Sequence, residues 1–408
     1  MREGNVDMKI LVVNAGSSSL KFTLFNMAGG ENSVLASGQV ERIGSDSPNL
    51  IYKRPDGFKS EEVIHISNHG EALSEIRKKL LDPQVGVLKN LSEVSAIGHR
   101  VLHGGEKVTQ PVLITPEVKD IIRECFPLGP LHNPANLTGI EACEKDFPGV
   151  PNVGVFDTQF HQTMPPEAYL YAIPYDYYKK FGIRKYGFHG TSHHYVTLST
   201  ADFLGKKLEE TTIITCHLGN GCSMAAVKNG KVIDTTMGLT PLEGLMMGTR
   251  SGDLDPAAVL RLIELGHSRE EVDKILNKKS GLLGIGGINS GDMRDMINAA
   301  AEGNAQAELA IRMFVRRVVK YIGAYYVLLG GAEAIVFTGG IGEYSVPIRE
   351  RVMEGIGALN IRLDKEKNNA CFGKKGIIST EDSAWKAIVM PTNEELMIAL
   401  STMRVLGK

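Results

Sequence analysis

Two short polar turns follow apolar runs and could bind an anion. Residues 15–19 (AGSSS) come after the apolar run 9–14, and residues 219–223 (GNGCS) come after the run 212–215. Glycine and serine present backbone N–H groups and hydroxyls with little side-chain bulk, which suits phosphate oxygens. Each turn alone also fits an ordinary hairpin. Their recurrence in parallel contexts, with Lys21 close to the first turn, favours phosphate binding.

Two arginines at predicted turn positions could bind a second anionic group. Arg100 ends the segment Gly-His-Arg, and Arg250 lies in Met-Gly-Thr-Arg-Ser-Gly-Asp. A guanidinium flanked by glycines can point into a cleft, where its fork matches a carboxylate or a phosphate. A structural ion pair is an equally open interpretation for either residue.

Histidines and oxygen-bearing side chains complete the candidate groups. His132, His161 and His189 lie in predicted turns, and no spacing among them selects a metal. Asn14, Asp157 and Glu394 lie next to predicted strand or helix ends and together suit Mg²⁺, which takes oxygen ligands and keeps several waters. His189, between Phe188 and Gly190, has a packed neighbour on one side and an open side on the other.

Several common site motifs are absent from the sequence. It contains no G-x-x-x-x-G-K-[ST], no intact G-x-G-x-x-G, no H-E-x-x-H and no Cys/His spacing of a structural zinc site. What remains is a set of phosphate-binding turns, two arginines, a histidine and ligands for a hard cation. These are the components of phosphoryl transfer from a nucleotide.

The elements that carry these groups predict a duplicated α/β architecture. The first polar turn lies between predicted strands at 9–14 and 20–24, and the second between 212–215 and 224–227, with a further strand at 231–233. Helices are predicted at 70–81 and 305–329, and a buried strand at 334–337. Alternating strands and helices indicate an α/β protein that binds ligands at strand ends.

Composition limits the class of protein. The chain has 408 residues, 45 basic and 47 acidic side chains, and a formal net charge of −2, which gives no reason to expect nucleic acid or an anionic membrane as partner. The row Arg312, Arg316 and Lys320 is interpreted as a solvated helix face.

Five cysteines without a C-x-x-C pair indicate a reducing compartment. No run of about 18 apolar residues is present, so a cytoplasmic protein of two or three domains is expected.

Taken together, these segments resemble the acetokinase family, within the superfamily that includes sugar kinases, actin and heat-shock chaperones. The resemblance covers the chain from Met8 to about Leu400. It depends on motifs in the same order as in the family: 13–21 (VNAGSSSLK), 98–105 (GHRVLHGG), 131–134 (LHNP), 156–158 (FDT), 186–193 (YGFHGTSH), 217–221 (HLGNG), 248–250 (GTR) and 391–395 (PTNEE).

The resemblance implies a fold, an activity and partners. The fold would be a duplicated ribonuclease-H-like (actin-like ATPase) fold with two domains around an interdomain cleft. The expected domains are 1–158 plus about 392–408, which bind the acyl group and phosphate, and 159–391, which bind the nucleotide and make the dimer contacts. The activity would be reversible transfer of the ATP γ-phosphoryl group to acetate, with Mg²⁺ as cofactor, Mn²⁺ as its substitute, and a homodimer as the assembly.

The resemblance also implies roles for individual residues. Asn14 and Glu394 would hold Mg²⁺, Arg100 would bind the acetate carboxylate, and Asp157, His189 and Arg250 would be catalytic. The acyl pocket would be lined by Leu102, Leu131 and Pro241. The nucleotide contacts would be Lys21, His217, Leu218, Gly219, Asn220, Gly221, Asp292, Met293, Arg294, Gly340, Ile341, Gly342, Glu343 and Tyr344.

Acetate is already ionised at pH 7, because its pKa is close to that of a glutamic acid side chain, about 4.3. Asp157 should therefore hold Mg²⁺ or an arginine in place rather than take a proton, and the cationic groups should offset the repulsion between acetate and triphosphate.

Three positions depart from the family pattern: Gln159 replaces alanine, Tyr344 replaces asparagine beside the expected adenosine site, and Leu102 replaces valine in the acyl pocket. Leu102 favours acetate over longer acids. Propionate or broad short-chain acyl kinase activity, and a non-catalytic nucleotide-binding protein, are the alternatives.

Overall fold

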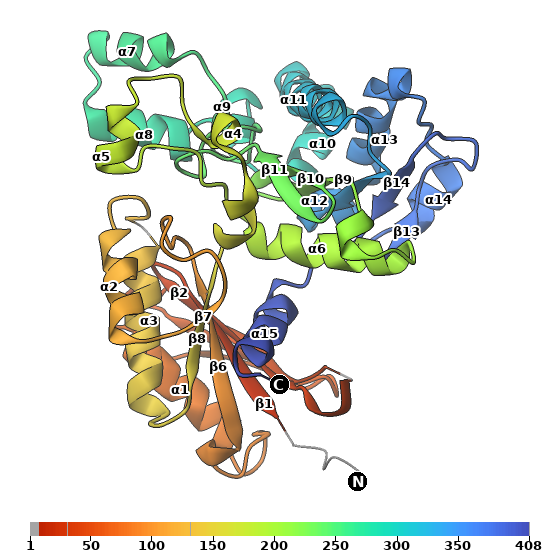
Figure 1. Cartoon of the computed structure of the whole chain (residues 1–408). Coiled ribbons are helices and arrows are strands. Elements are labelled where there is room, and N and C mark those ends of the chain that lie inside the picture. Colours follow the sequence, from red (N-terminus) through yellow and green to blue (C-terminus); the bar gives the residue numbers. More distant parts are fainter. Residues whose placement is uncertain (1–7, 31, 131, 408) are drawn as a thin grey trace. The chain divides into compact units, whose positions relative to one another are not determined.

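The computed structural model describes residues 8–30, 32–130 and 132–407, which form two compact units. Unit 1 comprises residues 1–159 and 393–408, and unit 2 comprises residues 160–392. The C-terminal segment therefore returns to the unit in which the chain begins. Figure 1 shows the elements of each unit.

Unit 1 is built on an eight-stranded sheet with the order β5-β4-β3-β2-β1-β6-β8-β7. Its strands are β1 (Lys9–Ala15), β2 (Ser19–Asn26), β3 (Ser33–Glu41), β4 (Asn49–Lys53), β5 (Lys59–Val63), β6 (Val94–Val101), β7 (Val112–Leu113) and β8 (Asn152–Phe156). Its helices are α1 (His69–Leu81), α2 (Pro116–Glu124), α3 (Asn133–Asp146) and α15 (Glu394–Val405).

The apolar run of β1 is buried on both faces, so its side chains alternate between two cores. Leu11 and Val13 pack in the core that α1 and α3 cover, whereas Ile10 and Val12 pack with Ile398 of α15. Figure 1 shows α1 and α3 on one side of this sheet and α15 on the other. These layers place the beginning of α15, and so Glu394, beside the central strands.

Gly98 in β6 allows α15 to approach the sheet closely. A Cβ atom at this position would lie 2.5 Å from Thr402 Oγ1 and 2.7 Å from Ile398 Cγ2 of α15. Asn393 caps the helix, since its side chain accepts from the Leu396 backbone N–H at 2.9 Å. The position of Glu394 thus depends on a glycine about 300 residues earlier in the chain.

Unit 2 contains a six-stranded sheet with the order β11-β10-β9-β12-β14-β13. Its strands are β9 (Ile213–Leu218), β10 (Cys222–Lys228), β11 (Lys231–Thr235), β12 (Ala334–Thr338), β13 (Gly376–Ile377) and β14 (Lys386–Val389). Its helices are α4 (Pro166–Tyr169), α5 (Asp176–Phe181), α6 (Gly190–Phe203), α7 (Pro256–Glu264), α8 (Arg269–Lys278), α9 (Gly281–Ile285), α10 (Met293–Ala301), α11 (Ala305–Leu329), α12 (Gly339–Tyr344), α13 (Val346–Gly355) and α14 (Lys365–Ala370).

Each of the two sheets contains the same arrangement of five strands. In unit 1, β1 pairs antiparallel with β2 and parallel with β6, β2 pairs antiparallel with β3, and β6 pairs parallel with β8. In unit 2, β9 has the same relations to β10 and β12, which in turn pair with β11 and β14. This repeated order confirms the predicted duplication and the ribonuclease-H-like (actin-like ATPase) fold.

Several local predictions are confirmed and two are wrong. The strands predicted at 9–14 and 334–337 and the helices predicted at 70–81 and 305–329 are present. Arg100, however, is not in a turn: β6 continues through it, because it pairs with Val155 of β8. The polar turns are also shorter than predicted, since Ser19 begins β2 and Cys222 begins β10.

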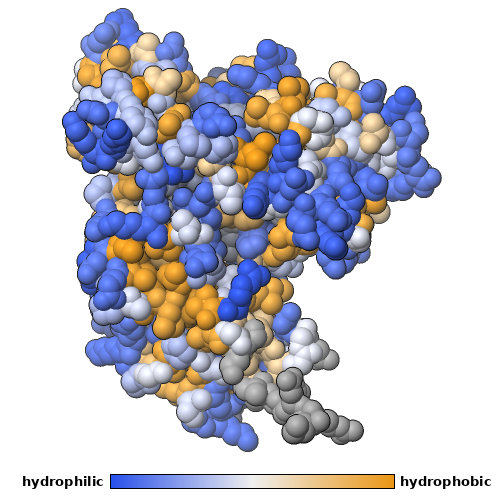
Figure 2. Space-filling model, viewed as in Figure 1, coloured by the Kyte–Doolittle hydropathy of each residue, from blue (hydrophilic) through white to orange (hydrophobic). Residues whose placement is uncertain are grey.

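The surface of the described residues is mixed in polarity. Figure 2 shows mainly hydrophilic side chains over α13 and α14, while hydrophobic side chains gather in one area of unit 1. Across the described ranges, none of the helices combines the length and the apolar character needed to cross a membrane.

Candidate active site

Unit 1 has a small pocket at the C-terminal ends of its central strands. The pocket has a volume of about 210 Å³ and is lined by residues at the end of β1, the end of β6 and the start of α3. Four residues predicted to be functional line it, namely Asn14, Lys21, Arg100 and Leu102. Ala15, Gly16 and Ser19 of the predicted anion-binding turn and the candidate His132 also line it, and the structure adds Asn136. Its size and its arginine suit a small carboxylate.

Arg100 is held by a buried carboxylate. Its Nε atom donates to Asp157 Oδ1 at 3.1 Å and its Nη2 atom donates to Oδ2 at 2.5 Å. Asp157 is fully buried after β8, whereas the Arg100 side chain keeps 24% of its surface exposed in the pocket. The charge of Asp157 raises the pKa of Arg100 above its usual range. Asp157 therefore acts as the orienting partner of a permanently charged guanidinium.

His99, which precedes Arg100 in β6, is buried as a neutral side chain. Its Nε2 atom lies 2.7 Å from Asn152 Oδ1, and burial lowers its pKa to about 4. Since histidine in an unfolded chain has a pKa of about 6.5, the stabilisation from neutral His99 is complete above pH 6.5 and is lost as the pH falls towards 4.

We expect this group alone to lower the free energy of unfolding by about 2 kcal/mol between pH 7 and pH 5. In His99→Gln, whose amide can still donate to Asn152, the difference in unfolding free energy between these two pH values should shrink by that amount. Urea unfolding at each pH measures it. An equal pH dependence in both proteins would contradict the assignment.

Glu394 lies in an excess of negative charge. Burial raises its pKa to about 7, although Arg100 lowers it, and the charges of Asp157 and Glu395 add to the rise. Asp157 and Glu394 thus both interact with the charge of Arg100, which already forms an ion pair with Asp157. An added cation would relieve this excess, and the amide of Asn14 lines the neighbouring pocket. These donors fit Mg²⁺, which commonly uses one or two protein oxygens together with water and phosphate.

Within the described residues, no cluster of three or more His, Cys, Asp or Glu side chains is arranged to hold a metal ion by itself. Leu131, predicted for the acyl pocket, lies outside the described residues.

Unit 2 has a larger cavity of about 800 Å³ at the ends of β9 and β12. Eight predicted nucleotide contacts line it: Gly219, Asn220, Asp292, Met293, Arg294, Gly340, Ile341 and Tyr344. The prediction missed Thr249, Ser290, Gly291, Ile297, Asn298, Ser345, Pro347 and Phe372, which also line it. Ile297 and Asn298 follow Arg294 by three and four residues on α10, so helical periodicity could have found them.

Other predicted contacts lie behind the cavity wall or elsewhere. Leu218 is fully buried in β9, and the Glu343 carboxylate accepts from the backbone N–H groups of Gly339 at 2.8 Å and Thr392 at 3.1 Å. Neither Leu218 nor Glu343 lines the cavity. The remaining three, His217, Gly221 and Gly342, adjoin residues of the wall. Lys21 lies in the unit 1 pocket.

An aromatic pair at the rim of the cavity is fixed by a buried arginine. The rings of Tyr344 and Phe372 meet nearly at right angles, with centroids 5.2 Å apart. Arg349 is fully buried and uses its Nε and both Nη groups on oxygens of Gly342, Glu343, Asn368 and Cys371, at 2.7–3.0 Å. These bonds hold the two segments that carry the rings.

His189 has an unusual backbone conformation. It precedes α6 with φ +57° and ψ +23°, a left-handed conformation that is uncommon for a residue with a side chain. His161 supports this turn, because its Nε2 atom lies 2.9 Å from the Phe188 carbonyl oxygen. The His189 ring lies against His217, with centroids 4.4 Å apart, and its Nδ1 atom lies 2.9 Å from Ser223 Oγ.

His189 and Arg250 converge above Gly221. A Cβ atom on Gly221 would lie 3.4 Å from His189 Nε2 and 3.7 Å from Arg250 Nη1. The glycine therefore leaves room for both groups beside the turn that follows β9. Their side-by-side placement suits the oxygens of a phosphoryl group.

Arg250 is a partly buried cation. Its Nη1 atom donates to the Pro241 carbonyl oxygen at 3.0 Å and lies 3.8 Å from Met247 Sδ, and no carboxylate of the described part of unit 2 pairs with it. Burial lowers its pKa. A half-buried guanidinium in such surroundings would be stabilised by an anionic ligand.

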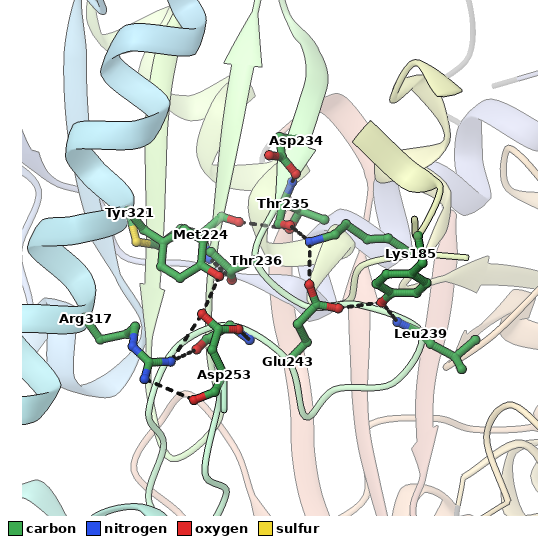
Figure 3. Close-up of polar contacts among 12 residues, drawn as sticks. Lys185, Met224, Asp234, Thr235, Thr236, Leu239, Glu243, Asp253, Arg317 and Tyr321 are labelled. Carbon is green, nitrogen blue, oxygen red and sulfur yellow. Dashed lines mark hydrogen bonds and ion pairs between the residues drawn. The ribbon is translucent and has the colours of Figure 1, made fainter. Parts of the chain in front are cut away.

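The loop that carries Pro241 and Arg250 is fixed by two ion pairs (Figure 3). Glu243 accepts from Lys185 Nζ at 3.0 Å. Asp253 accepts from Tyr321 of α11 at 2.7 Å and pairs with Arg317 at 3.2 Å. These contacts anchor the loop on both sides of Arg250.

The repeated sheet order, with a cavity at the strand ends of each unit, defines a protein of the actin-like ATPase fold. The chain matches the model of the acetokinase family over residues 9–400. The chain belongs to this family.

Individual relatives agree over their whole length. The chain is 53% identical to the acetate kinase of Clostridium novyi (98% of this chain, 99% of the relative) and 55% identical to that of Finegoldia magna (98% and 100%). Among solved structures, Porphyromonas gingivalis acetate kinase has a TM-score of 0.93 at 46% identity, and a propionate kinase from Francisella tularensis has 0.91 at 41% identity, each covering 98% of this chain and 100% of that chain.

Proposed function

We propose that this chain is an acetate kinase, which transfers the γ-phosphoryl group of ATP reversibly to acetate and forms acetyl phosphate and ADP. The observation that carries the proposal is the 210 Å³ pocket of unit 1, in which Asp157 orients Arg100 towards a small carboxylate. The 800 Å³ cavity of unit 2 would hold the nucleotide. The identity to two acetate kinases over almost their whole length also supports acetate as the substrate.

The residues would divide the work as follows. Arg100 binds the acetate carboxylate, with Leu102 limiting the acyl group, and Asp157 fixes the guanidinium. Acetate needs no base, because it is ionised at neutral pH. A carboxylate oxygen attacks the γ-phosphorus as the bond to the ADP oxygen breaks, and His189 and Arg250 stabilise the charge on the phosphoryl oxygens. Inversion of a chiral γ-phosphoryl group supports this direct transfer, whereas retention would require a phosphoenzyme.

Mg²⁺ is proposed as the cofactor, with Asn14 and Glu394 as its protein ligands. The bound ion would neutralise phosphate charge. Replacing Glu394 by glutamine keeps its shape but removes its charge, so the Mg²⁺ concentration for half-maximal rate should rise about tenfold or more. Glu395→Gln is the matched control on the next position of α15 and should leave this concentration within twofold. Equal Mg²⁺ dependence in both variants would exclude Glu394 as a ligand.

Acyl phosphate formation from MgATP with acetate, propionate and butyrate in parallel tests the function. The single methylene that separates the acids is worth about 1–3 kcal/mol in such a pocket. A preference for acetate supports the proposal, and a preference for propionate would give the chain the activity named for its Francisella relative. Turnover of none of the acids would favour a non-catalytic nucleotide-binding protein.

The assembly is proposed to be a homodimer. In unit 2, Leu260, Ile263 and Leu265 on and after α7 are exposed apolar side chains, which would be buried in an interface. Sedimentation equilibrium measures the mass: twice the chain mass supports the dimer, and a single chain mass contradicts it.

A further inference from the structure

Three buried side chains form a continuous series of hydrogen bonds behind His189. Ser223 Oγ lies 2.9 Å from His189 Nδ1 and 2.7 Å from His193 Nε2. His193 Nδ1 in turn lies 2.7 Å from Thr215 Oγ1. Thr215, His193 and Ser223 are all fully buried. We call these three residues the hydroxyl–imidazole chain.

Few hydrogens are available for these bonds. Burial, with the charges of His161 and His217 next in effect, lowers the pKa of His193 well below its usual value, so its ring is neutral. A neutral imidazole carries one N–H, and each hydroxyl carries one O–H. Ser223 could accept from both rings, but its own buried hydroxyl hydrogen would then have no acceptor among the described contacts. Three hydrogens therefore fill the three contacts, and each group donates in the same direction along the hydroxyl–imidazole chain.

The distances select one of the two directions. If donation ran from His189 towards Thr215, the Thr215 hydroxyl would have to donate to the Ala225 carbonyl oxygen, which lies 3.4 Å away. That separation exceeds the usual O–H···O range of 2.5–3.0 Å. In the opposite direction, Thr215 donates to His193 Nδ1, His193 Nε2 donates to Ser223, and Ser223 donates to His189 Nδ1. All three bonds are then 2.7–2.9 Å long.

We propose that Thr215, His193 and Ser223 hold the ring proton of His189 on Nε2. His189 Nδ1 accepts the Ser223 hydroxyl, so the neutral ring carries its proton on the nitrogen that lies beside Gly221 and Arg250. The hydroxyl–imidazole chain is thus a set of positioning residues. It makes His189 a hydrogen-bond donor on the same side as the Arg250 guanidinium. The catalytic consequence rests on the proposed phosphoryl transfer, whereas the position of the proton does not.

The first test measures the proton directly. Protein labelled with ¹⁵N-histidine is studied by two-bond ¹H–¹⁵N correlation spectra, whose nitrogen shifts distinguish a protonated Nε2 from a protonated Nδ1. The His189 signals are assigned by their loss in His189→Asn. We expect a protonated Nε2 and an unprotonated Nδ1 in the native chain. A proton on Nδ1, alone or together with one on Nε2, would overturn the proposal.

Substitutions separate this effect from a loss of packing. Ser223→Ala should shift His189 substantially towards the Nδ1–H form and lower kcat about tenfold or more, with the KM values for acetate and ATP within twofold. Ser401→Ala, which removes a fully buried hydroxyl without a hydrogen-bond partner in α15, is the matched control and should change neither quantity. An unchanged tautomer in Ser223→Ala would contradict the proposal.

His193 offers a rescue experiment. In His193→Gln, the amide oxygen can accept from Thr215 and the amide N–H can donate to Ser223, so the His189 tautomer and kcat should remain close to native. His193→Leu should disturb both. Equal effects of the two substitutions would show that His193 only fills space. If the native protein transfers no phosphoryl group at all, the proposed function fails, while the NMR spectra still decide the position of the proton.

Discussion

Replacing Arg100 by methionine is expected to lower acetate phosphorylation strongly and to destabilise the protein at the same time. The substitution removes the cation that would bind the acetate carboxylate, and the loss of such an oriented donor lowers kcat/KM by about 10²- to 10³-fold or more. It also leaves Asp157 buried and without its guanidinium. Because removing one partner of a buried pair costs about 3–5 kcal/mol, and Arg100 is partly exposed, we expect a loss of about 3 kcal/mol.

The two effects can be separated by a second substitution. In the double variant Arg100→Met/Asp157→Leu, the unpaired carboxylate is also gone, so most of the unfolding free energy should return. Activity should not return, since the acetate-binding group is still missing. Arg100→Lys keeps the charge but loses the two-pronged contact with Asp157, so KM for acetate should rise with a smaller loss of stability. Urea unfolding and acyl phosphate assays measure both properties.

One result would contradict this account of Arg100. If Arg100→Met kept native kcat/KM for acetate but lost stability, the Arg100–Asp157 pair would be only structural. That is the alternative that the sequence left open, because a guanidinium near glycines is compatible with either role.

The fold could be predicted from the sequence where periodicity is strong. The run 9–14 is apolar at every position except its ends, since β1 is covered on both faces, and the turn that follows β1 has its counterpart after β9. The course of β6 through Arg100 could not be predicted, because the charge at that position suggested a strand end. Only the pairing with β8 keeps Arg100 in the strand.

The candidate site was predicted where its residues lie in short motifs and missed where distant segments meet. Asn220 lies in a glycine-rich turn, and Arg294 and Gly340 lie at the beginnings of α10 and α12, in short segments that the sequence analysis named. Phe372 joins Tyr344 at the rim of the cavity because Arg349 fixes both segments, and nothing local to Phe372 indicates a site. Ser223 and His193 lie in recognised motifs, but their connection to His189 depends on the pairing of β9 with β10 and on the packing of α6.

Replacing Arg250 by methionine should lower activity, as the Arg100 substitution does, but it should not lower stability. Arg250 would neutralise charge on the transferred phosphoryl group, and arginines in this role contribute about 10³- to 10⁵-fold to the rate. We therefore expect kcat to fall at least about 10³-fold. In the protein without ligand, the Arg250 side chain lowers the stability of the folded state. Burial disfavours its charge, and no described carboxylate of unit 2 pairs with it.

Methionine fills similar space without a charge, and the lost bond to the Pro241 carbonyl is worth only about 1 kcal/mol. The unfolding free energy of Arg250→Met should thus stay within about 1 kcal/mol of native or rise. Arg312→Met, at a position of α11 whose side chain is 65% exposed, is the control and should change neither activity nor stability.

The decisive measurement is the rise in Tm that MgADP produces. A ligand that binds the folded state raises Tm according to its affinity, so a phosphate contact by Arg250 predicts a smaller rise in Arg250→Met than in Arg312→Met. A variant that lost stability but kept both kcat and the full MgADP-dependent rise would show that Arg250 serves the loop rather than the phosphate. The two arginines differ in a further respect: Arg100 is paired with Asp157 before any ligand binds, whereas no described carboxylate of unit 2 pairs with Arg250, so a bound phosphate would supply its counter-charge.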